Sequence, residues 1–273
     1  MTIGTAAFDW VRSVVLVEAG IVIEPGKEYL IESRLTPLAR AAGASDVNVY
    51  VDQLRSSPLA RVKQTLVEAL TTNETSWFRD GSPYLLFEKS ILPQLRTTRA
   101  AERKVRVWSA ACSTGQEPYS LAMILEETLV CEGWRAEIFA SDIDETVLAK
   151  ARSGTYSQLE INRGLPAARL VQSFTRQGVG WQINPALRSM VTFHRVNLSE
   201  SLPPAGQFDV IFLRNVLIYF SIDTRRDILT RIRRMCRPDG FLVLGGAETT
   251  LGVDEQWERV AGGATTCYRP LAA

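Results

Sequence analysis

Apolar side chains in the first part of the chain recur at the spacing of amphipathic helices. Val11, Val15 and Ala19 fall on one helix face, and Gly20 follows them as a stop signal. The same spacing returns in three further stretches, around residues 29–39, 49–54 and 62–70. None of these stretches alternates between apolar and polar positions as a half-buried strand would. We therefore predict a small all-helical domain over residues 1–70.

The pattern changes at Val105, after which short apolar runs alternate with amphipathic helices. The runs are typical of strands buried in a parallel sheet, and they lie at residues 105–111, 138–141, 191–196, 210–213 and 241–244. Helical periodicity separates several of them, at residues 118–130, 144–153 and 223–236. Strands that alternate with helices predict a doubly wound α/β sheet. We assign this domain to residues 105–273.

Two segments fit neither pattern. Residues 71–104 are polar and charged apart from one apolar patch at 84–95, so we predict a connector that contains a helix. Residues 154–190 are too long for a simple crossover between strands. Within them, Gly178 and Gly180 lie between two short runs that resemble strands. This pattern indicates an inserted β-hairpin subdomain.

The overall composition narrows the class of protein. Hydrophobic residues make up 46% of the chain, charged residues 22%, and the net charge is +1, so no global field attracts nucleic acid or an anionic membrane. No apolar stretch approaches the roughly 20 residues that span a bilayer, and the start of the chain lacks the pattern of a signal peptide. We expect a cytoplasmic monomer that neither binds nucleic acid nor inserts into a membrane.

Cysteine and histidine usage argues against metal and disulfide sites. The four cysteines include no C-x-x-C pair, so neither a structural zinc nor a disulfide framework is expected, and a reducing compartment fits better. His194 is the only histidine. A single histidine excludes most catalytic zinc sites and any mechanism that needs two histidines.

A turn of small residues follows the first predicted strand, in the sequence W-S-A-A-C-S-T-G-Q-E-P-Y-S at residues 108–120. Ligands of open α/β sheets bind where strands end at such turns. Gly115 is the only glycine of this turn, so the glycine pattern that cradles a dinucleotide is missing. A nucleoside ligand such as S-adenosylmethionine fits the turn better. On spacing alone, an ordinary strand–turn–helix junction explains it equally well.

Polar side chains mark the ends of two later strands. Asp142 ends the second predicted strand, where a carboxylate can accept both ribose hydroxyls, whereas Asp144 suits the role of a helix cap. Arg214 and Asn215 interrupt an apolar run at the end of the fourth strand, and buried polar groups need partners. A ligand site and a structural salt bridge of Arg214 explain that pair equally well, and Tyr219 could be a core residue.

The connector opens with T-T-N-E-T-S-W-F-R-D at residues 71–80, which on physical grounds alone reads as a helix start capped by Thr72 or Asn73. A resemblance changes that interpretation. Nearly the whole chain resembles the CheR family of chemotaxis receptor methyltransferases. The resemblance includes T-T-N-x-T-x-(aromatic)-F-R in the connector, the turn at 108–120, A-S-D-I-D at 140–144, R-N-V-L-I-Y-F at 214–220 and R-P-D-G at 237–240.

The resemblance implies an S-adenosylmethionine site built from both the connector and the sheet domain. It implies that Asn73, Thr75 and Arg79 reach the cofactor from the connector. It also implies that Arg79 is the catalytic residue, with Tyr219 beside the cofactor as a second one. The other implied cofactor-binding residues lie in the sheet domain: Glu117, Asp142, Asn197, Leu198, Arg214 and Asn215.

The implied reaction is methyl transfer to glutamate carboxylates on the cytoplasmic helical bundle of chemotaxis receptors. A glutamate is already ionised at neutral pH, so no general base is required, in agreement with the single histidine. Two alternatives remain open: a methyltransferase that acts on another protein, and a non-catalytic cofactor-binding signalling module. A nucleic-acid methyltransferase is disfavoured, because R-N-V-L at 214–217 stands where such enzymes carry a proline-containing motif that receives a flipped base.

The inserted hairpin carries one further expectation. Some family members use this subdomain to grip a peptide from the receptor tail as an added strand. Here the loop at residues 176–181 is compact, and we take it to be a few residues shorter than in those members. We therefore expect an enzyme that does not need a receptor tail. The opposing interpretation is that Trp181 anchors a different tail.

Overall fold

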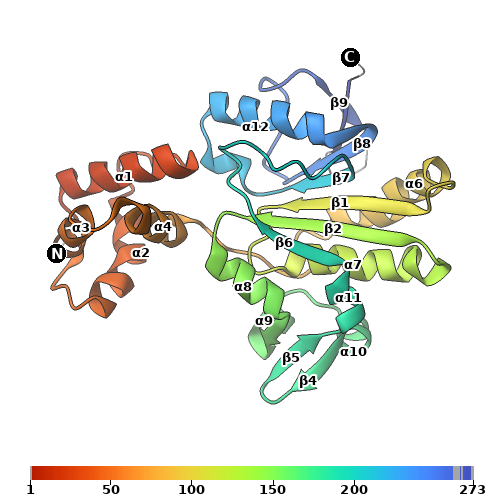
Figure 1. Ribbon diagram of the computed structural model, residues 1–273, viewed down its shortest axis with the longest axis horizontal. Coiled ribbons are helices and arrows are strands. Elements are labelled where there is room, and N and C mark those ends of the chain that lie inside the picture. The colour runs from red at the N-terminus through yellow and green to blue at the C-terminus, as the bar shows by residue number, and fades with distance from the viewer. Residues whose placement is uncertain (1, 261–264, 266, 272–273) are drawn as a thin grey trace. The chain divides into compact units, whose positions relative to one another are not determined.

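The computed structural model describes residues 2–260, 265 and 267–271, which divide into two compact units (Figure 1). The first unit contains the chain up to Thr72 together with Tyr219–Thr224, and the second contains the remainder. The sequence pattern places residues 219–224 in the sheet domain instead. The structure groups them with the first unit, because the amide of Val22 donates to the carbonyl of Tyr219 at 2.8 Å and Ile21 bridges Phe220.

The first unit has four helices, α1 (Thr5–Ala19), α2 (Glu28–Ala41), α3 (Val47–Arg55) and α4 (Leu59–Leu70). Its core comes from the apolar faces that the periodicity predicts, with Val11, Val15 and Leu35 fully buried. Gly20 ends α1 in a left-handed conformation with φ of 69°, which glycine adopts without steric cost. The prediction of an all-helical N-terminal domain is confirmed.

Within the described residues of the second unit, seven strands form one sheet in the order β6-β2-β1-β7-β8-β10-β9. They are β1 (Lys104–Ala110), β2 (Arg135–Asp142), β6 (Val191–Arg195), β7 (Phe208–Leu213), β8 (Cys236–Leu244), β9 (Trp257–Val260) and β10 (Cys267–Pro270). The first five in chain order are parallel, and β10 is antiparallel to both neighbours. The doubly wound sheet is confirmed, whereas the short strands β9 and β10 were not predicted.

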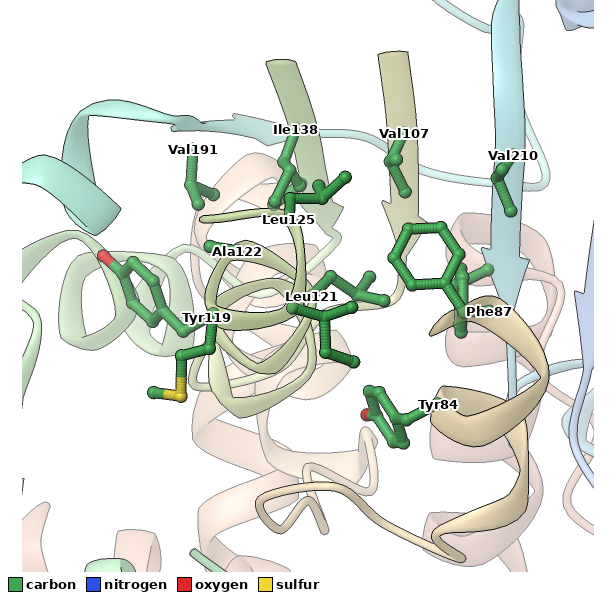
Figure 2. Close-up of a cluster of buried hydrophobic side chains, with 14 of the residues drawn as sticks. Tyr84, Phe87, Val107, Tyr119, Leu121, Ala122, Leu125, Ile138, Val191 and Val210 are labelled. Atoms are coloured by element: carbon green, nitrogen blue, oxygen red, sulfur yellow. The ribbon is translucent and has the colours of Figure 1, made fainter. Parts of the chain in front are cut away.

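Helices α7 (Gln116–Thr128), α8 (Glu145–Ser153) and α12 (Ile222–Met235) correspond to the three predicted between strands. Figure 2 shows one face of the sheet packed against α7 and the helical segment that carries Phe87, with these strand side chains directed toward them: Val107, Ile138, Val191 and Val210. The neighbouring positions Trp108 and Ile211 point to the opposite face and are also buried. Burial on both faces explains why the strands read as continuous apolar runs.

The connector contains one helical run from residue 82 to 98, as predicted, and this run includes the apolar patch at 84–95. It consists of α5 (Ser82–Leu86), a π-helical turn (Phe87–Ile91) and α6 (Leu92–Thr98). Pro93 lacks an amide proton and so cannot continue the regular hydrogen-bond ladder. The π turn ends at Ile91, two residues before Pro93, so the irregular hydrogen bonding lies next to the proline.

The inserted subdomain contains β3 (Thr155–Ser157), α9 (Gln158–Asn162), α10 (Ala167–Ser173), β4 (Phe174–Gln177), β5 (Gly180–Ile183) and α11 (Pro185–Ser189). The predicted hairpin is β4–β5, with Gly178 at a φ of 58° in its turn. Pairing of β3 with the other side of β5 completes a three-stranded antiparallel sheet. In the part of the chain that the structure describes, no helix is long and apolar enough to cross a membrane.

Candidate functional site

The candidate residues of the sheet domain lie on the side of the sheet where the parallel strands have their carboxyl-terminal ends, which we call the sheet edge. Strands β1, β2, β6 and β7 are parallel neighbours, so their carboxyl ends meet at the same edge, where open α/β sheets bind ligands. Asp142 is the last residue of β2. Asn197 and Leu198 follow β6, and Arg214 and Asn215 follow β7. The topology therefore collects residues that lie far apart in the sequence.

The turn between β1 and α7 has an unusual backbone. Ala111 and Ser113 have positive φ values of 59° and 51°, and Gly115 has 95°. Such conformations cost energy for residues with a side chain and cluster at ligand sites. Gly115 is also required by packing, because a Cβ atom there would lie 2.9 Å from both the Ala151 Cβ and the Tyr156 hydroxyl. The surroundings hold this turn in a shape that the local sequence does not favour.

Asp142 ends β2 with a nearly buried carboxylate, which is 7% exposed. Its Oδ2 accepts the amide of Ser113 at 2.8 Å, and its Oδ1 accepts the amide of Asp144 at 3.1 Å. Burial raises the pKa of Asp142 to about 6 against the lowering effect of these amides. Asp144 instead caps α8 by accepting the amides of Thr146 and Val147. The cap predicted for Asp144 is confirmed, and ligand binding by Asp142 stays a prediction.

The buried side chain of Arg214 is the centre of an ion-pair network with one buried and one exposed carboxylate. Its Nη1 donates to Glu117 Oε2 at 2.9 Å, while Glu117 Oε1 accepts the Ser109 hydroxyl at 2.8 Å. Its Nη2 donates to Asp80 Oδ2 at 2.6 Å and to the Arg79 carbonyl at 3.0 Å. Burial lowers the pKa of Arg214, but the Glu117 carboxylate and its other neighbours raise it overall. The salt-bridge interpretation is thus correct, and it joins the connector to the sheet edge.

The start of the connector is not a capped helix. The first helix after α4 begins only at Ser82. The side chain of Asn73 donates to Asp144 Oδ2 at 2.7 Å, and its carbonyl accepts the Ser113 hydroxyl at 2.8 Å. The local prediction fails because Asn73 finds partners at the sheet edge, and these hold the chain extended. The structure therefore places Asn73 beside the residues that follow β1 and β2, and its contact with the cofactor stays a prediction.

Arg79 lies in a second unusual turn. The residues on either side of it, Phe78 and Asp80, have positive φ values of 49° and 68°. The Arg79 side chain is partly exposed, and its Nη1 donates to the Glu74 carbonyl at 2.8 Å. Thr75, in the extended stretch before this turn, is also partly buried. The turn thus presents an arginine that retains hydrogen-bonding capacity, since a guanidinium carries five donors.

The remaining predicted residues differ in how the structure places them. Asn197 holds its own loop by accepting the amide of Ser199 at 3.1 Å, and Leu198 is buried at 6% exposure. Asn215 is partly buried and has a positive φ of 57°. Tyr219 is only partly buried, so it is not a core residue, and it belongs to the first unit. Its predicted position beside the cofactor stays a prediction.

Two residues of this edge were missed by the sequence analysis. Asp80 forms an ion pair with Arg214. Glu248 is buried beside Asn215, and its carboxylate accepts the backbone amide of Asn215 at 2.7 Å. An acidic residue soon after Gly245-Gly246 at the end of a buried strand could have signalled Glu248. For Asp80 no comparable signal exists, because exposed acidic residues are common in connectors.

The fold and the site together define a class. A parallel sheet in which one antiparallel strand, β10, lies between β8 and the edge strand β9, with an acidic residue at the end of β2, is that of a class I S-adenosylmethionine-dependent methyltransferase. The chain belongs to the CheR methyltransferase family. Residues 6–71 match its all-alpha domain and residues 73–266 match its S-adenosylmethionine binding domain. The cofactor is accordingly S-adenosylmethionine.

Proteins of the same family support this assignment over the full chain. The sequence is 37% identical over 265 residues to chemotaxis protein methyltransferase Cher2 of Pseudomonas putida, covering 95% of this chain and 96% of that protein. It is 37% identical over 274 residues to chemotaxis protein methyltransferase 1 of Pseudomonas aeruginosa, covering 98% and 99%. The chemotaxis protein methyltransferase of Escherichia coli is 35% identical over 254 residues, covering 91% and 86%.

Proposed function

We propose that this protein transfers a methyl group from S-adenosylmethionine to glutamate side chains of chemotaxis receptors in the cytoplasm and forms glutamate methyl esters. The names of its relatives support a role in chemotaxis. The observation that carries the proposal is the pair of hydrogen bonds that Arg214 donates to the connector turn, one to the Asp80 carboxylate and one to the Arg79 carbonyl. These hydrogen bonds hold the turn that contains Arg79, the proposed catalytic residue, near the carboxyl-terminal ends of the sheet strands, where Asp142 also lies.

The residues of this edge fit S-adenosylmethionine. An ionised carboxylate has about four lone-pair sites, so the Asp142 oxygens can still accept ribose hydroxyls beside their bonds to backbone amides. Arg214 Nε is buried without a hydrogen-bond partner among the described residues. An unsatisfied buried donor is costly, and the carboxylate of the cofactor is a suitable acceptor for it. Asn73, Thr75, Glu117, Asn197, Leu198 and Asn215 would complete the binding site.

The main task of the protein in this reaction is to orient the substrate carboxylate toward the methyl group of the cofactor. Bound S-adenosylmethionine supplies a methyl group on a sulfonium, and the sulfur keeps the electron pair of the broken bond. The substrate glutamate is ionised at neutral pH, so its oxygen forms the new bond without a general base. Arg79 would orient this carboxylate, because a guanidinium holds carboxylates in a defined geometry. It should orient without a tight clamp, since a fully paired carboxylate is a weaker nucleophile.

Tritiated S-adenosylmethionine and purified cytoplasmic receptor fragments test the proposal. We expect transfer of label to the receptor and its release as volatile methanol in mild base, which identifies an ester. Label that is stable in mild base would contradict ester formation. Cofactor binding without transfer to any receptor fragment would favour another protein substrate or a non-catalytic signalling module.

A further inference from the structure

The buried carboxylate of Glu248 lies next to a residue of the cofactor site. Glu248 is 7% exposed and follows β8, whose last residue Leu244 pairs with Leu213 at the end of β7. Because these two strands are parallel, the segments that leave them emerge side by side. One segment carries Asn215, and the other carries Glu248.

Glu248 binds four backbone amides with its two oxygens. Oε1 accepts the amides of Val216 at 2.9 Å and Leu217 at 2.7 Å. Oε2 accepts the amides of Asn215 at 2.7 Å and Gly245 at 2.9 Å. Successive amides around a left-handed residue form a concave nest that binds anions. Here the three amides of residues 215–217 form such a nest, and an internal carboxylate fills it.

Gly245 allows this convergence. A Cβ atom at Gly245 would lie 2.7 Å from Glu248 Oε2 and 2.9 Å from Asn215 Nδ2. No side chain therefore fits between the carboxylate, the Asn215 amide group and the strand end. The absence of a side chain lets all three groups pack closely, and this restricts the direction of the Asn215 side chain.

We propose that Glu248 is a positioning residue of the cofactor site, which fixes the backbone of Asn215 and thereby the direction of its side chain. Asn215 adopts a φ of 57°, a conformation that costs energy and persists only where the surroundings impose it. Glu248 imposes it by holding the amide of Asn215 and the next amide, so both peptide planes around this residue are fixed. The proposal rests on the cofactor site and not on the identity of the methyl acceptor.

Glu248→Gln is the most conservative test, because glutamine keeps one acceptor oxygen and turns an NH₂ group toward the other pair of amides. Asp254→Asn is a matched control. Asp254 is also 7% exposed, accepts the amide of Gln256 at 3.1 Å and pairs with Arg233 at 3.3 Å. Calorimetric titration with S-adenosylhomocysteine needs no receptor, so it tests the proposal separately from the proposed function.

We expect Glu248→Gln to raise the dissociation constant of S-adenosylhomocysteine about tenfold, equivalent to about 1.4 kcal/mol. Asp254→Asn should leave this constant unchanged, even where both variants lower the melting temperature equally. In methylation assays the KM for S-adenosylmethionine should rise with Glu248→Gln. A merely structural role would reduce the folded fraction, and therefore the apparent kcat, without changing KM.

Unchanged cofactor affinity and unchanged KM in folded Glu248→Gln protein would overturn the proposal. If that variant fails to fold, Gly245→Ala provides a second test. Its methyl group would displace the carboxylate while the charge is retained, and the same weakening of S-adenosylhomocysteine binding is expected. Wild-type affinity in Gly245→Ala would likewise show that the contact does not position the site.

Discussion

Unfavourable backbone conformations concentrate at the candidate site. Six of the described residues other than glycine have positive φ. Five of them lie in the three turns at the sheet edge: Phe78, Asp80, Ala111, Ser113 and Asn215. Only Arg103 lies elsewhere. Each such conformation costs roughly 1–3 kcal/mol, so the hydrogen bonds from Asp142, Arg214 and Glu248 are needed to hold these turns.

Asp142 should make cofactor binding depend on pH. We expect Asp142→Ala to weaken binding of S-adenosylhomocysteine by about 1.5–3 kcal/mol, the scale of hydrogen bonds to a charged group. Because the pKa of this carboxyl is about 6, wild-type affinity should fall as the pH drops through that value, where the carboxylate is protonated. Calorimetry across this range checks both effects, with Asp142→Asn as the variant whose affinity should not titrate there.

The same pKa has a consequence for the stability of the cofactor-free protein. The folded pKa lies above the usual 3.8, so this group stabilises the fold at low pH, and its contribution is lost as the pH rises through about 6. In denaturant titrations, the stability of wild type relative to Asp142→Asn should therefore fall as the pH rises toward about 6, because asparagine does not titrate. A stability difference that stays constant over this range would show that burial does not raise the pKa of the carboxyl group.

Arg79→Ala should reduce turnover by ~100-fold or more, the scale of an orienting group, with a much smaller effect on cofactor affinity. The physical reason is that the methyl acceptor loses its guanidinium partner while the other predicted cofactor contacts remain. Arg163→Ala is a suitable control, because the Arg163 side chain is exposed in the same region and pairs with the exposed Glu74. Wild-type turnover in folded Arg79→Ala protein would remove Arg79 from the catalytic role.

At the scale of elements, the inserted subdomain contacts two of the three turns with positive φ, the turn after β1 and the connector turn. Its Tyr156 hydroxyl donates to the Thr114 carbonyl at 2.8 Å, inside the turn after β1. The buried Trp77 of the connector packs edge-on against Tyr156, with ring centroids 4.9 Å apart, and donates to the Glu160 carbonyl at 3.0 Å. The inserted subdomain therefore stabilises the turn after β1 and the start of the connector turn through these contacts.

Tyr156→Phe tests this support by removing one hydroxyl. A buried hydrogen bond contributes about 0.5–1.5 kcal/mol, so we expect cofactor affinity to fall about two- to tenfold as the turn loosens. Tyr119→Phe is the matched control, because the Tyr119 hydroxyl is also buried and donates to the Ala151 carbonyl at 2.9 Å, outside that turn. Equal cofactor affinities of the two variants in calorimetry would contradict a specific role of Tyr156.

The hairpin also carries the prediction about receptor tails. Strand β4 is an edge of the three-stranded sheet, with Thr175, Arg176 and Gln177 exposed, and Gly178 and Val179 make up a short turn. We expect methylation of receptors to persist after removal of their C-terminal tails. Titration with tail peptides should show no tight binding. Micromolar affinity together with loss of methylation on tail removal would show the opposite.

At the scale of the whole molecule, we propose that the first unit docks on the helical bundle of the receptor, with its exposed basic residues facing acidic receptor surfaces. Lys27 and Arg40 are exposed on it, whereas Arg34 donates to the Thr71 carbonyl at 3.1 Å and thus serves the fold. Reversing the charges of Lys27 and Arg40 to glutamate should slow receptor methylation and reduce its salt dependence, because surface charges mainly act on association.

This double variant should bind S-adenosylhomocysteine like wild type, since neither Lys27 nor Arg40 is among the predicted cofactor-site residues. Lys89→Glu reverses an exposed charge of that second unit and serves as the control in the same methylation assay. Unchanged methylation and salt dependence in the double variant would remove these two charges from the docking surface.

The sequence by itself determined the fold class and most of the elements, although not the short strands β9 and β10. Helical spacing, buried apolar runs, the stop at Gly20 and the cap at Asp144 depend on residues a few positions apart, and the structure has them as predicted. The doubly wound sheet follows from alternation, and strand ends then locate Asp142, Arg214 and Asn215. The helices and caps could be predicted because the interactions that stabilise them join residues close in sequence. The strand ends could be predicted because the alternation of strands and helices fixes the sheet topology.

Only the tertiary structure decided how distant segments complete the site. Asn73 appeared to favour a helix cap, yet it bonds to Asp144, 71 positions away. Arg214 grips a connector turn 134 positions earlier through Asp80, and Glu248 fills a nest of amides more than thirty positions before it. The helix propensities of most residue types differ from one another by at most about 1 kcal/mol per residue. Buried charged hydrogen bonds contribute more, so long-range partners overrule the local preference at these positions.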